Sequence, residues 1–359
     1  MKRLVLAITL FLAACGSKPG QEVLLPVKSA VANDQPFRMF VATTRGRSAT
    51  QALYFDNGRS PTVSYVAYDI SIPPNHAKGE IEWPKDPPDP RTEFVTVGRS
   101  DYDRRGFLNA LTEHGNTDVS LFIHGYNNSM EESVFRAAQI AKDADAGGAA
   151  ILFAWPSAAR ATGYVADRDA ADFSRAALAT LIEDLSDSRK VRRIVVIGHS
   201  MGGRLTMEAL MQLRLKGRSD VLREVEVVLA DPDIDHDLFW QQARIVGKLP
   251  TPLSVMVAPD DRALRVSQIL ASGRERIGKA DVRDPDMMAK AEAHGVRLID
   301  VTAISTDRMA HSRIVQIAAL YDTLPVAKPG TGLRRAGAFV FGAVGLGMAE
   351  IGSELGPSR

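Results

Sequence analysis

Short runs of valine, isoleucine and leucine alternate with helical segments along most of this chain, from about residue 119 onward. Short, nearly continuous apolar runs are typical of strands buried on both faces, and helices between them supply the crossovers that parallel neighbours require. The pattern predicts an α/β fold in one domain, 36–328, with a mostly parallel central sheet and helices on both faces.

The expected strands lie at 37–42, 62–72, 93–97, 119–123, 149–154, 193–197, 225–229, 253–257 and 296–299. The expected helices lie at 129–143, 169–185, 202–215, 238–246, 263–270 and 311–320. Because only a short helix fits between the strands at 225–229 and 253–257, no large cap domain is expected.

Composition excludes several classes of protein. Lys and Arg number 44 against 43 Asp and Glu, so the chain lacks the cationic excess of a nucleic-acid binder. An apolar fraction of 45% excludes a disordered chain. The single cysteine excludes a disulfide framework.

The N-terminus has the features of an export signal. Lys2 and Arg3 precede an apolar run at 4–14 that is too short to span a bilayer and ends at Cys15. This segment resembles the lipobox of bacterial lipoprotein signal peptides, and the alternative is a plain secretory signal. The resemblance implies cleavage after residue 14 and a lipid anchor on Cys15. With Gly16 after the cysteine, it implies an outer-membrane protein that faces the periplasm or the cell surface.

The segments that flank the domain lack its regular pattern. Residues 15–35 show no clear periodicity and are expected to form a tether. Residues 329–359 include an apolar, glycine-rich stretch that could pack on the body, lie on the membrane or bind a partner.

The strand expected at 193–197 runs into Gly198-His199-Ser200-Met201-Gly202, a G-x-S-x-G pattern that precedes a helix. Such a turn holds the serine in a strained conformation, and the flanking glycines remove Cβ atoms that would clash with neighbouring backbone. The serine then lies at a helix N-terminus, which favours developing negative charge.

With this elbow in context, the chain resembles the α/β-hydrolase superfamily, and within it a bacterial family of uncharacterised esterase- or lipase-like hydrolases. The resemblance covers most of the body through the motifs at 40–45, 71–76, 123–127, 154–157 and 198–203. It implies a serine hydrolase with Ser200 as nucleophile, followed in the chain by an acid and then a histidine.

Three histidines follow Ser200: His236, His294 and His311. His311 follows the last expected strand, so it should face the elbow across the carboxyl edge of the sheet. We therefore expect His311 to be the general base.

The acid has two candidate locations. Asp260 and Asp261 follow the strand at 253–257, and the family pattern of Asp before a basic residue, Ala and Leu selects Asp261. Asp260 is then expected to cap the helix at 263–270. The loop after the preceding strand is an alternative location for the acid, used by some relatives, and it contains Asp231, Asp233 and Asp235. If none of them is the acid, they are expected to be solvated loop residues or helix caps.

An oxyanion hole needs two backbone N–H donors, which the fold would take from Met201 and from Tyr126. Gly125 allows the backbone to turn close to the substrate, and His124 is expected to be structural. Trp155 and Tyr164 are expected at the pocket rim, although Trp155 could equally pack in the core.

No metal ion or other cofactor is expected, because His and Asp residues lack paired ligand spacing. The expected function is hydrolysis of a small-molecule or lipid ester through an acyl-enzyme. Alternatives are the same triad acting as phospholipase, thioesterase or peptidase, or a non-catalytic envelope binding protein.

Overall fold

The computed structural model describes residues 18–27, 35–51, 53–115, 117–145, 147–304, 307 and 309–319. These residues form nine strands, in chain order β1 (Phe37–Arg47), β2 (Phe55–Ser71), β3 (Val95–Tyr102), β4 (Thr117–Ile123), β5 (Ala149–Ala154), β6 (Val191–His199), β7 (Val225–Ala230), β8 (Leu253–Val257) and β9 (Val296–Asp300). The helices are η1 (Gln21–Leu24), α2 (Arg104–Leu111), α3 (Met130–Asp143), α4 (Tyr164–Asp187), α5 (Met201–Leu215), α6 (Ser219–Leu222), α7 (His236–Val246), α8 (Arg262–Leu270), η2 (Ile277–Lys279), α9 (Pro285–His294) and α10 (Arg313–Ala319).

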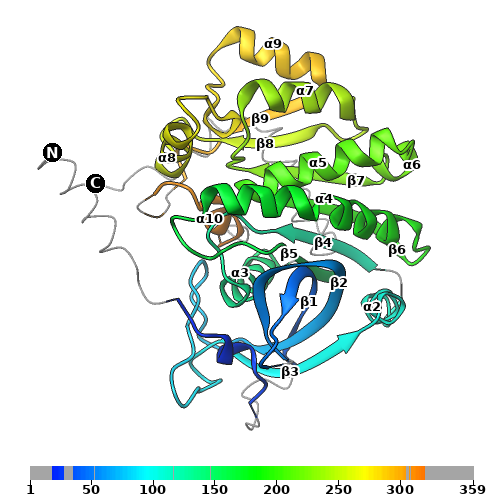
Figure 1. The fold of residues 1–359 in the computed structure, drawn as a ribbon, viewed down its shortest axis with the longest axis vertical. Coiled ribbons are helices and arrows are strands. Elements are labelled where there is room, and N and C mark those ends of the chain that lie inside the picture. Colours follow the sequence, from blue (N-terminus) through cyan, green and yellow to red (C-terminus); the bar gives the residue numbers. More distant parts are fainter. Residues whose placement is uncertain are drawn as a thin grey trace, which may run out of the picture.

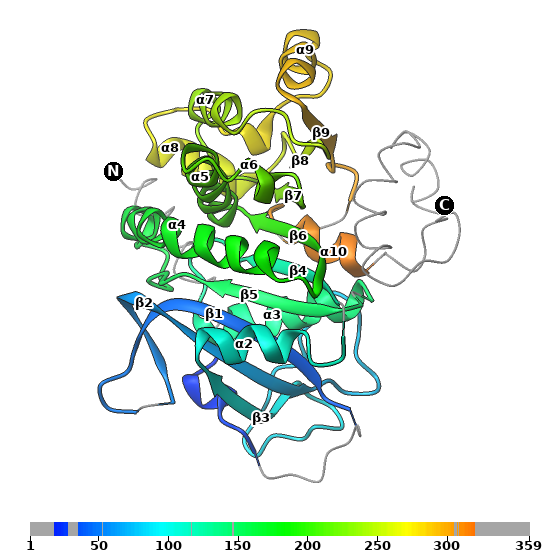
Figure 2. The same cartoon turned by 90° about the vertical axis from the view of Figure 1, so that its right-hand side faces the viewer.

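All nine strands form one sheet in the order β3-β2-β1-β5-β4-β6-β7-β8-β9 (Figure 1). Strand β2 pairs antiparallel with both β1 and β3, whereas the pairs from β1 across to β9 are parallel. Figure 2 shows the strands stacked from β3 at the bottom to β9 at the top. The predicted mostly parallel α/β sheet is confirmed.

Helices cover both faces of the sheet, and alternate residues of each strand point to opposite faces. In β4, Val119, Leu121 and Ile123 pack in one core with side chains of α2, α4, α5 and α7. Their neighbour Phe122 packs in a second core with α3 and α10. Strands buried on both sides explain the nearly continuous apolar runs in the sequence.

The observed elements depart from the predicted ones mainly where an apolar pattern is weak. Helices α2 and α9 were not predicted, because α2 buries only Phe107 and Leu111 and α9 only Ala291, which is too few for a clear apolar stripe. The third strand begins at Val95 rather than at 93 and continues to Tyr102.

The parallel strands bring five loops to one edge of the sheet. Register pairs Ile123 with Gly198, His199 with Ala230, and Val257 with Asp300, so the carboxyl ends of these strands lie next to one another. The loops that follow them carry every residue expected to take part in chemistry.

The segment predicted as a tether is partly held on the body. Leu24 in η1 is buried, Val27 N donates to Thr96 O at 3.0 Å, and Thr96 Oγ1 donates to Val23 O at 2.8 Å. Cys15 and residues 329–359 lie outside the described residues. Among the helices that are described, none is long and apolar enough to cross a membrane.

Candidate active site

Ser200 lies where the chain turns from β6 into α5. Its φ of +54° and ψ of −120° fall in a region that serine rarely adopts, at a cost of about 1–3 kcal/mol. The backbone is fixed on both sides, because Ser200 N donates to Ala230 O at 2.9 Å and Ser200 O accepts from Asp233 N at 3.1 Å. The serine therefore has the strained conformation that the motif predicts.

The two elbow glycines allow close backbone contacts that no other residue permits. A Cβ on Gly202 would lie 2.3 Å from Ile123 O and 2.5 Å from His124 O. A Cβ on Gly198 would lie 2.5 Å from Thr206 Oγ1. Because backbone atoms cannot yield cheaply, Gly202 in particular fixes how closely α5 packs against the end of β4.

Asp261 and His311 are in direct contact, although 50 residues separate them in the chain. His311 Nδ1 donates to Asp261 Oδ2 at 2.6 Å, and the carboxylate is fully buried. The other oxygen, Oδ1, accepts from Leu264 N at 2.8 Å and caps α8. The cap orients the carboxylate, and the carboxylate orients the imidazole.

The predicted cap role of Asp260 is wrong. Asp261 caps the helix, and Asp260 instead accepts two hydrogen bonds of 2.8 Å from Arg313 Nη2. The prediction failed because the two neighbouring aspartates are equivalent in sequence, and only the loop geometry decides which carboxylate points inward.

His311 also contacts the residue before the serine. His199 Nε2 donates to His311 O at 3.0 Å, and the two rings lie 4.9 Å apart. Burial, together with the nearby charge of His311, lowers the pKa of His199 to about 4. His199 is therefore neutral and ties the end of β6 to the His311 loop. Ser200 Oγ itself makes no hydrogen bond within the described part of the chain.

Asp231 is a second carboxylate beside His311, and it was not expected to be buried. Its side chain is 1% exposed, and neither oxygen has a hydrogen-bond partner among the described residues. It lies within 4.8 Å of ring nitrogens of His199 and His311, and its φ is +46°. Burial raises the pKa of Asp231 to about 7, which the charge of His311 partly offsets.

The predicted solvated character of this loop is also wrong for Asp233, which is 5% exposed. Asp233 accepts hydrogen bonds from Tyr164 Oη and Ser267 Oγ and pairs with Arg276 at 3.2 Å. Of the three aspartates, Asp235 is the one that acts as a cap, since it accepts from Leu238 N at the start of α7. The alternation of aspartate and apolar residues at 231–235 resembled an exposed loop because sequence alone does not show the buried partners.

Three acidic groups favour a charged His311. Burial opposes the imidazolium, but the hydrogen bond with Asp261 and the charges of Asp261, Asp231 and Asp233 outweigh it and raise the pKa of His311 to about 9. Three potential metal-ligand atoms, one each from His199, Asp231 and His311, lie within 4.8 Å of one another. Sequence spacing did not indicate this cluster.

Two backbone N–H groups in the loops at this edge have no hydrogen-bond partner among the described residues. Neither Tyr126 N nor Met201 N forms a hydrogen bond within the described residues. Met201 N belongs to the first turn of α5, where N–H groups have no acceptor within the helix. Tyr126 precedes Asn127, whose φ of +60° turns the loop back on itself.

Two buried charged residues, which the sequence analysis missed, hold this loop. Asp167 Oδ2 accepts from Asn127 N at 3.0 Å and from Ser157 Oγ at 2.6 Å. Arg45 is fully buried and donates to Asn128 O at 2.9 Å and to Ser157 O at 3.2 Å. Strand β1 also contains Arg38 and Arg47, so nothing in its sequence marks Arg45 as the arginine that is buried and needs buried partners.

Trp155 is not at the pocket rim. Its side chain is fully buried, stacks on His124 with 4.7 Å between ring centroids, and donates from Nε1 to His124 O at 2.8 Å. Tyr164 lines a neighbouring cavity with Met201 and Asp233 rather than the cleft beside His311. Trp155 therefore has its alternative role, packing in the core, because it directly follows a buried strand and continues the core of that strand.

A cleft of about 760 Å³ lies beside His199 and His311 at the carboxyl edge. Its lining contains three cations and one carboxylate: Lys18, Arg136, Arg160 and Glu132. It also contains an apolar strip from β4, α3 and α10: Phe122, Ile140, Ile314 and Val315. A volume of this size can hold one small ligand.

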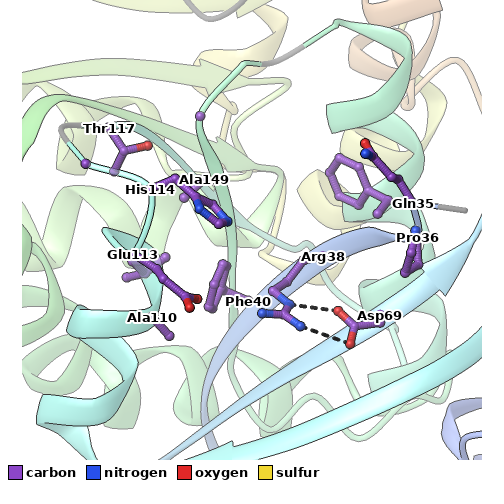
Figure 3. Close-up of a pocket in the computed structure, with 14 residues that line it drawn as sticks. Gln35, Pro36, Arg38, Phe40, Asp69, Ala110, Glu113, His114, Thr117 and Ala149 are labelled. Carbon is purple, nitrogen blue, oxygen red and sulfur yellow. Dashed lines mark hydrogen bonds and ion pairs between the residues drawn. The ribbon is translucent and has the colours of Figure 1, made fainter.

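A second cavity, of about 690 Å³, lies at the amino ends of β1, β4 and β5, away from these residues. Figure 3 shows Arg38 and Asp69 paired on one wall, with Glu113 and His114 on the opposite wall. Because Arg38 and Asp69 neutralise each other, we assign this cavity no chemistry.

The model of one protein family, described as "Alpha/beta hydrolase of unknown function (DUF900)", matches residues 101–327. No curated protein matches the chain.

Solved structures that match the chain include a cutinase-like protein from Cryptococcus sp., at 12% identity and a TM-score of 0.33, over 62% of this chain and 95% of that one. A protein described as a hydrolase from Agrobacterium vitis S4 matches at 13% identity and a TM-score of 0.34, over 73% of this chain and 95% of that chain. A protein described as a cell-surface hydrolase from Lactobacillus plantarum WCFS1 matches at 12% identity and a TM-score of 0.33, over 62% of this chain and 97% of that chain.

Proposed function

The chain belongs to the alpha/beta hydrolase family whose model it matches, and on that premise we propose that it is a serine hydrolase that cleaves an ester through an acyl-enzyme. The observation that carries the proposal is the contact between His311 Nδ1 and Asp261 Oδ2, at the strand edge that also holds the strained Ser200. The proposal assigns Ser200 as nucleophile, His311 as base and Asp261 as the acid that orients the base.

In the proposed mechanism Ser200 Oγ attacks the ester carbonyl while His311 Nε2 takes its proton. Asp261 keeps the Nδ1–H tautomer, which leaves the Nε2 lone pair free to act as the base. The imidazolium then returns the proton to the departing alkoxide. A water molecule, deprotonated by the same nitrogen, releases the acid and restores the serine.

The free N–H groups of Tyr126 and Met201 would stabilise the oxyanion of each tetrahedral intermediate. The bonds from Asp167 and Arg45 to the 127–128 loop hold one of these donors before substrate binds, so little reorganisation is needed during reaction. A donor of this kind contributes about 3–4 kcal/mol to transition-state binding.

The acidic surroundings of His311 have a consequence for pH. Only the neutral imidazole can accept the serine proton, and its pKa of about 9 leaves most of it charged at neutral pH. Activity should therefore rise with pH until the imidazole is neutral.

Turnover of p-nitrophenyl acetate by the purified protein, compared with Ser200→Ala, tests the proposal. We expect release of p-nitrophenol by the wild type and a loss of at least about 10³-fold in the variant. Equal rates would contradict it. Parallel assays with a thioester and an anilide distinguish ester hydrolysis from thioesterase and peptidase activity.

A further inference from the structure

The N-terminal segment is attached to the rim of the cleft beside His311. Lys18 lines the cleft, and its Nζ donates to Asn127 O and to Glu132 Oε2, both at 2.5 Å. Glu132 belongs to the first turn of α3 and also closes the capping box with Ser129. The chain thus enters the body at the carboxyl edge of the sheet, at the cleft that His199 and His311 also line.

Only two residues separate Lys18 from Cys15, the predicted site of lipid attachment. Three extended residues span at most about 11 Å. A body of this size has a radius of gyration of roughly 19 Å, so it is several times wider than this reach. While Lys18 keeps these contacts, a lipid anchor on Cys15 would hold the cleft close to the membrane and prevent it from turning away.

The chemistry of the cleft suits one end of a membrane lipid. Lys18 and Glu132 pair with each other, which leaves the positive charges of Arg136 and Arg160 in the lining, so the cleft favours an anionic group. The strip formed by Phe122, Ile140 and Ile314 offers an apolar surface to an acyl chain. A phosphate with a neighbouring acyl ester would meet both surfaces at once.

Exposed apolar side chains also lie around this edge. Val165, at the start of α4, is 63% exposed, and Met309, beside the start of α8, is 38% exposed. Leu270 is 59% exposed and lines the cavity that contains Met201. Side chains of this kind insert among lipid headgroups at little cost.

We propose that the cleft faces the membrane that holds the lipid anchor, and that the substrate is an acyl ester of an anionic glycerophospholipid in that bilayer. Ser200 would take the acyl group as the lysophospholipid leaves, and water would then release the fatty acid. This inference rests on the proposed function and on lipidation of Cys15, and the experiment separates these dependencies.

The test uses the full lipidated chain in vesicles of phosphatidylglycerol and phosphatidylcholine, with released fatty acid as the readout. A flexible Gly/Ser spacer of about 20 residues inserted between Ser17 and Lys18 adds about 25 Å of mean reach and up to about 70 Å when extended, which exceeds the width of the body and lets it turn. We expect it to lower hydrolysis of vesicle phosphatidylglycerol about tenfold, because the effective concentration of lipid at the cleft falls. The same spacer after Arg359 is the matched control and should change nothing.

Hydrolysis of soluble p-nitrophenyl acetate should stay within about twofold in both spacer variants, because the site itself is unchanged. Unaltered vesicle hydrolysis with the N-terminal spacer would overturn the inference, as would a preference for phosphatidylcholine. Palmitate labelling that persists in Cys15→Ala would also overturn it. Absence of p-nitrophenyl acetate turnover in every protein would instead refute the proposed function.

Discussion

Replacing Asp261 by asparagine separates the two roles of this carboxylate, which caps α8 and orients His311. The amide oxygen of the introduced side chain can still accept from Leu264 N, but its amide nitrogen then faces His311 Nδ1 and donates to it. The imidazole must carry its proton on Nε2, where it cannot take a proton from Ser200. We expect kcat/KM to fall by about 10⁴, or about 5.5 kcal/mol of transition-state stabilisation.

Stability should change little in this variant, because asparagine caps a helix about as well as aspartate. Asp261→Ala loses the helix cap as well, so its free energy of unfolding should be about 1 kcal/mol lower than that of Asp261→Asn. Asp260→Asn removes the same charge from the adjacent residue, whose carboxylate is half exposed and paired with Arg313, and should cost less than about threefold in kcat/KM.

The assay is p-nitrophenyl acetate hydrolysis, with thermal unfolding followed by circular dichroism. If Asp261→Asn kept more than about a tenth of the wild-type kcat/KM, the tautomer argument would be refuted. A large activity loss in Asp260→Asn would equally refute the assignment of roles between the two aspartates.

Three further predictions concern other buried groups. Asp231→Asn removes a negative charge near His311, so the rising limb of the kcat/KM–pH profile should move to lower pH. The unfolding temperature should rise, because a buried carboxylate without a partner among the described residues is lost. A pH profile whose rising limb does not move would contradict this prediction. Gly202→Ala forces a Cβ within 2.5 Å of two backbone oxygens and should cost at least about 1–3 kcal/mol of unfolding free energy in denaturant titration, and a cost near zero would show that the elbow has room. Burial opposes a charged His76, but hydrogen bonds to Asp143 at 2.9 Å and to a glutamate at 2.8 Å raise its pKa; the stability it contributes is therefore complete below about pH 6.5 and lost as pH rises through the folded-state value. His76→Gln should accordingly destabilise more at pH 6 than at pH 9, and an equal loss at both would contradict the linkage.

The sequence was sufficient to predict the sheet and the position of the elbow because both depend on local patterns. Strands β5 and β8 were predicted to the residue, since a proline lies two residues after the end of each apolar run. Asp261 and His311 were chosen from chain order and resemblance, and the structure brings these two side chains together.

Other features depend on contacts between distant segments, which a sequence pattern does not specify. Arg45 and Asp167 hold the same loop from β1 and α4, and neither lies in a motif that indicates this role. Asp231 has a sequence setting much like that of Asp235, yet one carboxylate is buried without a partner among the described residues and the other caps a helix. Trp155 could not be placed, because a residue at the end of a buried strand can face either the core or the site.

Covalent labelling by a fluorophosphonate, followed by peptide mapping, tests the central claim most directly. We expect one phosphonate adduct per folded chain, on the peptide that contains Ser200, with labelling abolished in Ser200→Ala and slowed in Asp261→Asn. A folded wild-type protein that takes no label, or one labelled on another residue while Ser200 stays unmodified, would contradict the account.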